Sequence, residues 1–145
     1  MRFRHTALTW INFSPDGEIL AAAANQGDVQ FFNQQGRRLM SITHTTKRDS
    51  VIYAVNFSPN GQFIATSGTD GTVKLWTRQG ELLRTLQVDE DIVFCVSFSG
   101  DGRTLATAGS DKTVKVWSWE GELLQTFRGH GDKVTRVRFS RTIAP

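Results

Sequence analysis

The sequence is poor in the residue types that build disulfide or metal-held frameworks. It has one cysteine, Cys95, and three histidines among 145 residues. A single thiol excludes an internal disulfide framework, and the apolar run 92–98 around Cys95 predicts a buried thiol rather than a catalytic one. His5, His44 and His130 stand far apart, with no pair of His or Cys at the spacing of zinc ligands. We therefore expect neither a metal nor another cofactor.

Long apolar runs and a strong excess of one charge are also lacking. The chain has 17 Lys and Arg against 14 Asp and Glu, a net charge of +3 that identifies no partner by itself. No segment approaches the ~20 apolar residues that cross a bilayer, and no apolar signal segment follows residues 1–5. No glycine turn runs into a helix with a following lysine, as a phosphate loop requires. These absences predict a soluble, cytoplasmic protein without membrane contact.

What the chain does contain is one pattern in three copies. Each copy begins with Phe-Ser, a turn and a glycine, at 13–17, 57–61 and 98–102. An aromatic follows 19 residues after the first Phe in every copy (32 − 13, 76 − 57 and 117 − 98), namely Phe32, Trp76 and Trp117. A fourth copy begins at 137–140. A period of about 40 residues predicts a repeat architecture in which each unit packs on its neighbours.

Each copy is predicted to form four short strands whose polarity rises along the unit. In the second copy the strands fall at 51–58, 63–67, 72–76 and 81–86, separated by turns rich in Gly, Asn and Asp. The first strand is apolar on both faces and the last is the most polar, which is the gradient expected from the axis to the rim of a propeller blade. The repeat also predicts a strand at 21–24, although alanine favours helices.

The fold class that follows is all-β: a β-propeller fragment of about three four-stranded antiparallel blades plus one strand of a fourth. We expect blades at about 8–43, 51–87 and 92–127, and the first strand of a fourth blade at about 134–140, within one partial propeller over 1–145. Three blades and one strand cannot close a ring. A fragment of a longer propeller, an interrupted reading frame and an assembly of identical chains all remain open, and we expect self-association through the open propeller ends.

The unit resembles the WD-repeat β-propeller family, and is similar to its bacterial multi-repeat members. The resemblance rests on stretches that recur in phase, namely 57–61, 64–66 and 70–76 in the second copy, 105–107 and 111–117 in the third, and Gly129-His130. The Asp that usually follows the Trp of this family is replaced by Thr77 and Ser118. The spacing between the motifs is nevertheless retained.

The resemblance implies a buried hydrogen-bond chain in each blade, running from Trp to Ser or Thr, then to His and to Asp. Linking such groups satisfies buried polar atoms and specifies the register of the strands. The members would be Trp76, Thr66, His44 and Asp70 in the second blade and Trp117, Thr107 and Asp111 in the third, whose loop 87–91 has no histidine. His44 lies 13 residues before Phe57, whereas His130 lies 9 before Phe139 (57 − 44 and 139 − 130). The first blade has Phe32, Ala22 and Gln26 at these positions and cannot form the chain.

Thr66, His44 and Asp70 also have the composition of a nucleophilic triad. Thr66 belongs to a strand interior without a strained elbow, and the equivalent loop of the third blade lacks a histidine. We therefore predict that the protein is not an enzyme. The prediction is a protein–protein interaction scaffold, part of a larger propeller or signalling protein.

Binding by such a scaffold is expected in the loops that connect its strands. From the third-strand aromatic to the next Phe there are 25 residues after Phe32 but 22 after Trp76 and Trp117 (57 − 32, 98 − 76 and 139 − 117). The loop near 45–50 is therefore longer, by three residues. Candidate contacts for a protein partner are the charged residues expected on that face: Lys47, Arg48, Asp49, Asp89, Glu90, Asp91, Asp132 and Lys133. An ordinary solvated loop is equally compatible with the sequence.

Two alternative functions stay open. A basic cluster near the C-terminus is suited to neutralising nucleic-acid phosphates, although solvated charges at a blade edge are the favoured interpretation; it comprises Arg128, Lys133, Arg136, Arg138 and Arg141. The chain is otherwise a truncated or self-assembling propeller fragment with no independent activity.

Overall fold

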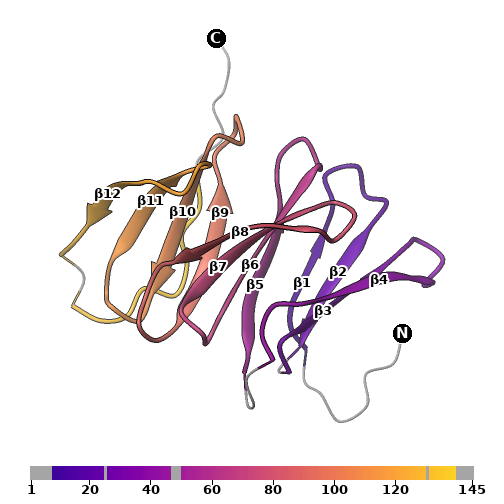
Figure 1. The fold of residues 1–145 in the computed structure, drawn as a ribbon, viewed down its shortest axis with the longest axis horizontal. Coiled ribbons are helices and arrows are strands. Elements are labelled where there is room, and N and C mark those ends of the chain that lie inside the picture. Colours follow the sequence, from indigo (N-terminus) through magenta and orange to yellow (C-terminus); the bar gives the residue numbers. More distant parts are fainter. Residues whose placement is uncertain (1–7, 25, 47–49, 130, 140–145) are drawn as a thin grey trace.

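The computed structural model describes residues 8–24, 26–46, 50–129 and 131–139. These residues form three four-stranded antiparallel sheets, and they include no helix long and apolar enough to span a bilayer. The all-β prediction with three antiparallel sheets is confirmed, and so is the strand at 21–24. The sheets lie side by side in chain order (Figure 1).

Within each sheet the strands are neighbours in sequence order. The first sheet contains β1 (Leu8–Phe13), β2 (Leu20–Ala24), β3 (Asp28–Phe32) and β4 (Arg38–Thr43). The second contains β5 (Ile52–Phe57), β6 (Phe63–Gly68), β7 (Thr72–Thr77) and β8 (Leu82–Gln87). The third contains β9 (Val93–Phe98), β10 (Thr104–Gly109), β11 (Val114–Ser118) and β12 (Leu123–Phe127).

The repeated Phe-Ser motif forms the turn between the first two strands of each sheet. In the second sheet the Ser58 hydroxyl donates to Asn60 Oδ1 over 2.7 Å and accepts from the backbone N–H of Phe63 over 3.0 Å. Gly61 closes the turn at φ +72°, a conformation that favours glycine. Ser14 with Asp16, and Ser99 with Asp101, form the same bonds. The sequence repeat is therefore, in part, one hydrogen-bonded turn built three times.

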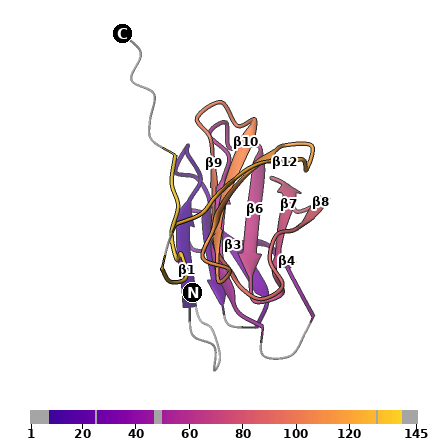
Figure 2. The same cartoon turned by 90° about the vertical axis from the view of Figure 1, so that its left-hand side faces the viewer.

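The three sheets stack face to face with an apolar core in each interface. Between the first two sheets the rings of Phe31 and Phe57 meet edge to face, with centroids 6.3 Å apart. Between the second and third, Leu75 and Val73 pack with Leu105 and other apolar residues of the third sheet. The inner strands β1, β5 and β9 lie along one edge of the stack, and β4, β8 and β12 lie towards the other (Figure 2).

Burial falls from the inner to the outer strand in the second and third sheets, as the sequence predicts. The first sheet differs, because its inner strand β1 has no buried residue. Four of the six residues of β5 are buried, whereas β8 has one buried residue, Leu86. An inner strand packs against neighbours on both faces, while an outer strand meets solvent. This gradient is the one expected of a propeller blade.

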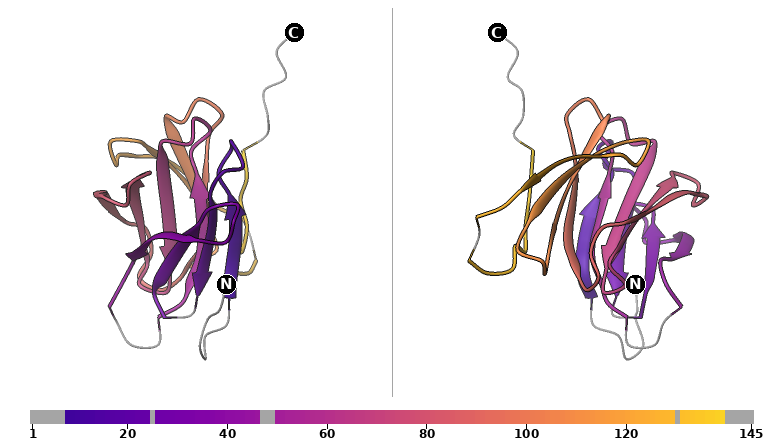
Figure 3. Two further views of the ribbon diagram at one scale, coloured as in Figure 1. Left: turned by 90° about the vertical axis from the view of Figure 1, so that its right-hand side faces the viewer. Right: turned by 60° about the vertical axis from the view of Figure 1, so that its left-hand side comes forward.

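Residues 131–139 are assigned to no strand, although a first strand of a fourth blade is predicted at about 134–140. The described part of this segment instead lies against the third sheet without ladder pairing (Figure 3). The backbone N–H of Val134 donates to the Gly109 carbonyl over 3.2 Å, and the Cys95 thiol donates to the Val137 carbonyl over 3.3 Å. Cys95 is buried, as predicted, and burial raises the pKa of its thiol.

Within the part of the chain that the structure describes, the first sheet has an apolar face that no other sheet covers. Phe13 is 59% exposed, whereas Phe57 and Phe98 at the same repeat position are 9% and 8% exposed. Ile11, at the position of the buried Val55, is likewise exposed. The strand register shows that the three Phe residues are equivalent. Phe13 pairs with Leu20, Phe57 with Ile64 and Phe98 with Leu105, each an apolar residue at or next to the start of the following strand. This open face is what the sequence predicts for an end blade.

Candidate functional site

A continuous hydrogen-bond chain runs through the second sheet and begins at an indole. Trp76 Nε1–H donates to Thr66 Oγ1 over 3.0 Å, and Thr66 Oγ1 lies 2.6 Å from His44 Nδ1. His44 Nε2 lies 2.9 Å from Asp70 Oδ1. A carboxylate only accepts, so Nε2 is the donor to Asp70, and in this tautomer Nδ1 accepts from the threonine hydroxyl. All donors in the chain then point the same way, from indole to carboxylate.

The strand ladder and one turn place these four side chains. In the pairing of β6 with β7, Ile64 lies opposite Trp76, which sets Thr66 beneath the indole. His44 comes from the other direction, because it follows the last strand of the first sheet and its backbone N–H donates to the Gly27 carbonyl over 2.8 Å. The chain of bonds therefore joins two sheets. It also satisfies polar groups that are fully buried at Thr66 and His44.

Asp70 is the anionic end of this chain. Burial raises the pKa of its carboxyl group, but the hydrogen bond from His44, together with bonds from the Thr72 backbone and hydroxyl, outweighs burial and lowers the pKa to about 2. The same Oδ1 accepts from the Thr72 backbone N–H over 3.0 Å and from its hydroxyl over 2.9 Å. The carboxylate therefore stays ionised throughout the neutral range.

Asp70→Asn is expected to reduce the acid sensitivity of folding. The folded pKa of about 2 lies below the ordinary value of 3.8. The ionised carboxylate therefore stabilises the fold above the ordinary pKa, and this contribution is lost as the pH falls through the folded value. Urea unfolding between about pH 5 and pH 2 should show the free-energy advantage of the wild type over the variant shrinking with falling pH. The exposed Glu122→Gln is the control, and parallel pH curves for the wild type and Asp70→Asn would contradict the assignment.

Thr66, His44 and Asp70 form a hydroxyl–imidazole–carboxylate sequence, as in a nucleophilic triad. A nucleophile must be reached by its substrate, yet Thr66 and His44 are both 0% exposed. The Thr66 oxygen also accepts a hydrogen bond from the Trp76 indole N–H. The arrangement can hold two sheets in register, but it presents no attacking group to solvent.

In the third sheet only the bond from the Trp to the Thr of this hydrogen-bond network is formed. Trp117 Nε1–H donates to Thr107 Oγ1 over 3.1 Å, as in the second sheet. Val88 occupies the backbone position of His44, because its N–H donates to the Gly71 carbonyl as that of His44 does to Gly27. Val88 packs in the apolar core. Asp111 is not joined to Thr107 and instead pairs with Lys115 and Thr113.

This correspondence explains the unequal histidine spacing in the sequence. His44 and Val88 each lie 12 residues after the third-strand aromatic (44 − 32 and 88 − 76), so the extra residues of the longer loop follow His44. Counting forward from Phe32, rather than back from Phe57, therefore identifies His44 as a member of the hydrogen-bond chain. In the first sheet Ala22 and Phe32 are buried at the corresponding positions. His130 lies outside the described residues.

A family model named WD40, for the WD domain or G-beta repeat, matches residues 36–77 and 80–118, which is more than half of the chain. The chain belongs to the WD40 repeat family. WD40 folds are generally protein-interaction scaffolds and typically are not enzymes. The match begins within the turn between β3 and β4, and so it is offset from the sheets.

Solved structures confirm the propeller fold of this WD40 chain. A structure of U3-55K superposes with a TM-score of 0.85 at 23% identity, covering 97% of this chain and 45% of that chain. A crystal structure of RRP9 WD40 repeats gives a TM-score of 0.85 at 24% identity, covering 97% and 44%. This chain thus spans less than half the length of either structure. No curated protein shows significant sequence similarity to it.

The candidate contact loops of the WD40 repeats are placed only in part. Lys47, Arg48 and Asp49 lie outside the described residues. Asp89 joins two loops, because its Oδ1 accepts from the Asp91 N–H over 2.9 Å and its Oδ2 from the Asp111 N–H over 3.1 Å. Glu90 and Asp91 are exposed beside a hollow of about 460 Å³. The described residues contain no group of three acidic, His or Cys side chains arranged to hold a metal.

The basic C-terminal segment packs in part on aromatic rings. The Arg136 guanidinium lies 5.5 Å from the centre of the Trp10 ring, and the Lys133 ammonium lies 5.6 Å from that of Phe94. Asp132, the other candidate contact in this segment, accepts the Lys133 backbone N–H over 2.7 Å. Arg141 lies outside the described residues. Among the four basic residues of this cluster that the structure describes, Lys133 and Arg136 thus contact aromatic rings of the chain.

Proposed function

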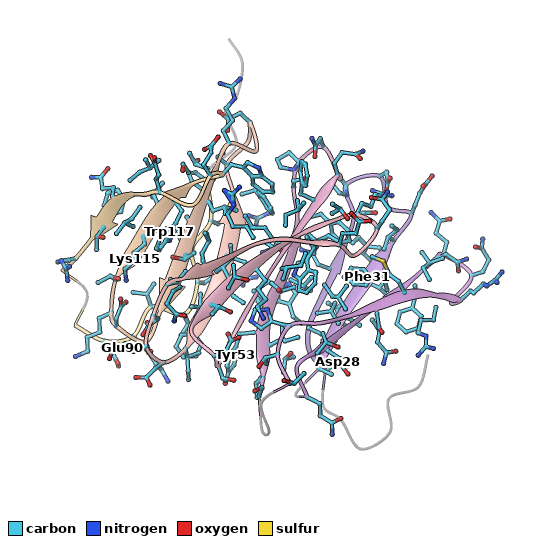
Figure 4. The ribbon with its side chains drawn as sticks, in the orientation of Figure 1. Asp28, Phe31, Tyr53, Glu90, Lys115 and Trp117 are labelled. Atoms are coloured by element: carbon cyan, nitrogen blue, oxygen red, sulfur yellow. The ribbon has the colours of Figure 1, made fainter. Side chains whose placement is uncertain are left out.

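We propose that this WD40 chain is a non-catalytic scaffold that binds a protein partner through the face bearing the loops 45–50, 88–92 and 110–113. Strand alternation brings these loops to the same end of the stack. Figure 4 shows Glu90 at the same edge of the molecule as Asp28. A rigid sheet stack that presents loops at one end is suited to binding. We place it in the cytoplasm, as the sequence suggests.

The mixed charge of this contact face is the observation that supports the proposal most. Glu90, Asp91 and Asp111 are exposed on it, and so are the cations Lys112 and Lys133. Patterned charge of both signs favours specific docking with a complementary protein surface and speeds association. A uniformly basic face would favour nucleic acid instead.

Reversing two charges in the long loop should weaken capture of the partner. The variant Lys47→Glu with Arg48→Glu is expected to reduce partner capture about tenfold, mainly through slower association. A pull-down followed by surface plasmon resonance with the captured protein would measure the effect. The melting temperature should change little, because surface substitutions usually alter stability by less than about 0.5 kcal/mol.

A matched control lies on the opposite face. Arg37 and Arg38 are adjacent, exposed cations at the turn into β4. Arg37→Glu with Arg38→Glu introduces the same charge change, and capture should be retained. Equal loss in both double variants, or loss in neither, would refute the assigned contact face.

The open face of the first sheet supports a second candidate, a propeller fragment that acts only when associated. Leu8, Ile11 and Phe13 form an exposed apolar surface on β1. Such a face favours association with another sheet. A light-scattering mass above that of one chain would support this candidate, and a stable monomer would oppose it.

A further inference from the structure

Two clefts open between neighbouring sheets on the face opposite the proposed contact loops. The first cleft lies between the first and second sheets, and the second cleft between the second and third. Each is flanked by the Phe-Ser turns of both adjoining sheets. Because the repeats are equivalent, the contents of the two clefts can be compared position by position.

The first cleft is filled by an arginine of the chain itself. Arg78 Nη1 donates to the Gly61 carbonyl over 3.0 Å, and Nη2 donates to Asp16 Oδ2 over 2.8 Å. The side chain is 18% exposed, so most of the guanidinium group is covered. One guanidinium group therefore bridges the turns of two sheets.

In the second cleft a tryptophan replaces this arginine. The N–H of Arg78 donates to the Gln62 carbonyl, and the N–H of Trp119 donates to the equivalent Arg103 carbonyl, both over 2.9 Å. The two residues therefore occupy the same backbone position. The Trp119 ring packs on Phe63, with centroids 4.7 Å apart, and its carbonyl accepts from Arg84 Nη1 over 2.8 Å. The ring centroid of Phe98 lies 6.3 Å away, so the indole contacts aromatic residues of both sheets.

The space that Arg78 fills in the first cleft is open in the second. A Cβ atom built on Gly61 would meet Arg78 Nη1 at 3.0 Å and Pro15 at 3.6 Å. On Gly102, the equivalent glycine, it would meet only Pro59 within 4 Å, at 3.9 Å. A hollow of about 510 Å³ results, lined by Trp119, Phe63 and Pro59 together with polar residues of the turns.

The charges around the second cleft favour a cation. Asp101 and Glu120 contribute two exposed carboxylates to its lining, against one guanidinium group from Arg103. The Gly102 carbonyl corresponds to the Gly61 carbonyl, which accepts from Arg78 in the first cleft. An aromatic wall, a carbonyl acceptor and excess negative charge together match a planar cation.

We propose that the second cleft binds an arginine side chain of a partner peptide. The guanidinium group stacks on Trp119, donates to the Gly102 carbonyl and lies near the carboxylates of Asp101 and Glu120. The partner thus supplies in trans the group that Arg78 supplies within the chain. This site lies on the face opposite the loops 88–92 and 110–113, so it is separate from the proposed contact face.

Titration of the ¹⁵N-labelled full chain with N-acetyl-L-arginine methylamide tests the proposal. Saturable shifts are expected at the Trp119 indole N–H and at the Gly102 and Arg103 amides, with an affinity in the millimolar range. The neutral citrulline analogue has almost the same shape and should bind about fivefold more weakly, because it lacks the charge. Absent shifts, or equal shifts with both probes, would overturn the proposal.

Two variants locate the binding in the cleft. Trp119→Arg restores the residue type of the first cleft, so the Gly102 and Arg103 amides should no longer respond to the probe. Asp101→Asn with Glu120→Gln should weaken binding about fivefold, and Asn60 shows that asparagine supports this turn. Unchanged binding in the second variant would oppose the proposal even if the first variant failed to fold. Lys47→Glu with Arg48→Glu, the double variant proposed to weaken partner capture, is the control and should leave the titration unchanged.

Discussion

His44→Ala should lower the free energy of unfolding by about 3–5 kcal/mol. The substitution removes the group that joins the Thr66 hydroxyl to the Asp70 carboxylate. It leaves a buried hydroxyl without its acceptor and a largely buried carboxylate without its strongest donor, in addition to a cavity. Urea unfolding of the purified chain at neutral pH measures the loss.

Val88→Ala is the matched control, because Val88 occupies the same backbone position one sheet later. Only apolar contacts are lost there, so the expected cost is about 1–2 kcal/mol. The difference between the two variants isolates the polar chain from the packing around it. If His44→Ala cost no more than Val88→Ala, the hydrogen-bond chain would contribute nothing net to stability.

Phe57→Ala should destabilise the fold by about 3–5 kcal/mol, whereas Phe13→Ala should change its stability by less than ~1 kcal/mol. The two residues hold the same position in successive repeats. Phe57 is 9% exposed and meets Phe31 edge to face in the core between two sheets, whereas Phe13 is 59% exposed on the open face of the first sheet. Denaturant unfolding at low protein concentration, where association is minimal, gives the comparison.

The same pair separates folding from association. Phe13→Ala should reduce any self-association seen by light scattering, because it removes apolar area from the open face. Phe57→Ala acts on an interface within the chain. Equal destabilisation by the two substitutions would show that a further sheet or a second chain already covers Phe13.

Much of the fold could be predicted from the sequence because each position of the repeat is represented by three residues, which can be compared. The Ala21 to Ala24 run is a strand despite its helix propensity, since it pairs with β1 and β3 in a buried sheet. Tertiary packing overrides an intrinsic preference of a few tenths of a kcal/mol per residue. The order and number of strands follow from the same spacing.

The candidate site could be predicted in its members but not in its connections. Trp76 and Thr66 face each other because of strand register, which the repeat indicates. Whether His44 reaches Thr66 depends on where the longer loop inserts its extra residues, and spacing measured from one side alone does not decide this. The second cleft was not predicted, because its shape depends on a Trp in place of Arg78 and on the turns of two different repeats.

His44 lies at the end of the first sheet, yet its partners Thr66 and Asp70 lie in the second. The sequence repeat matched at residues 36–77 therefore begins and ends one strand earlier than the second sheet. Duplicating or deleting DNA at sheet boundaries would separate a histidine from the partners that need it, whereas a cut near residue 36, where the family match begins, keeps them together. The matched repeat 36–77 thus combines the outer strand of the first sheet with three strands of the second, and its hydrogen bonds tie the two sheets together.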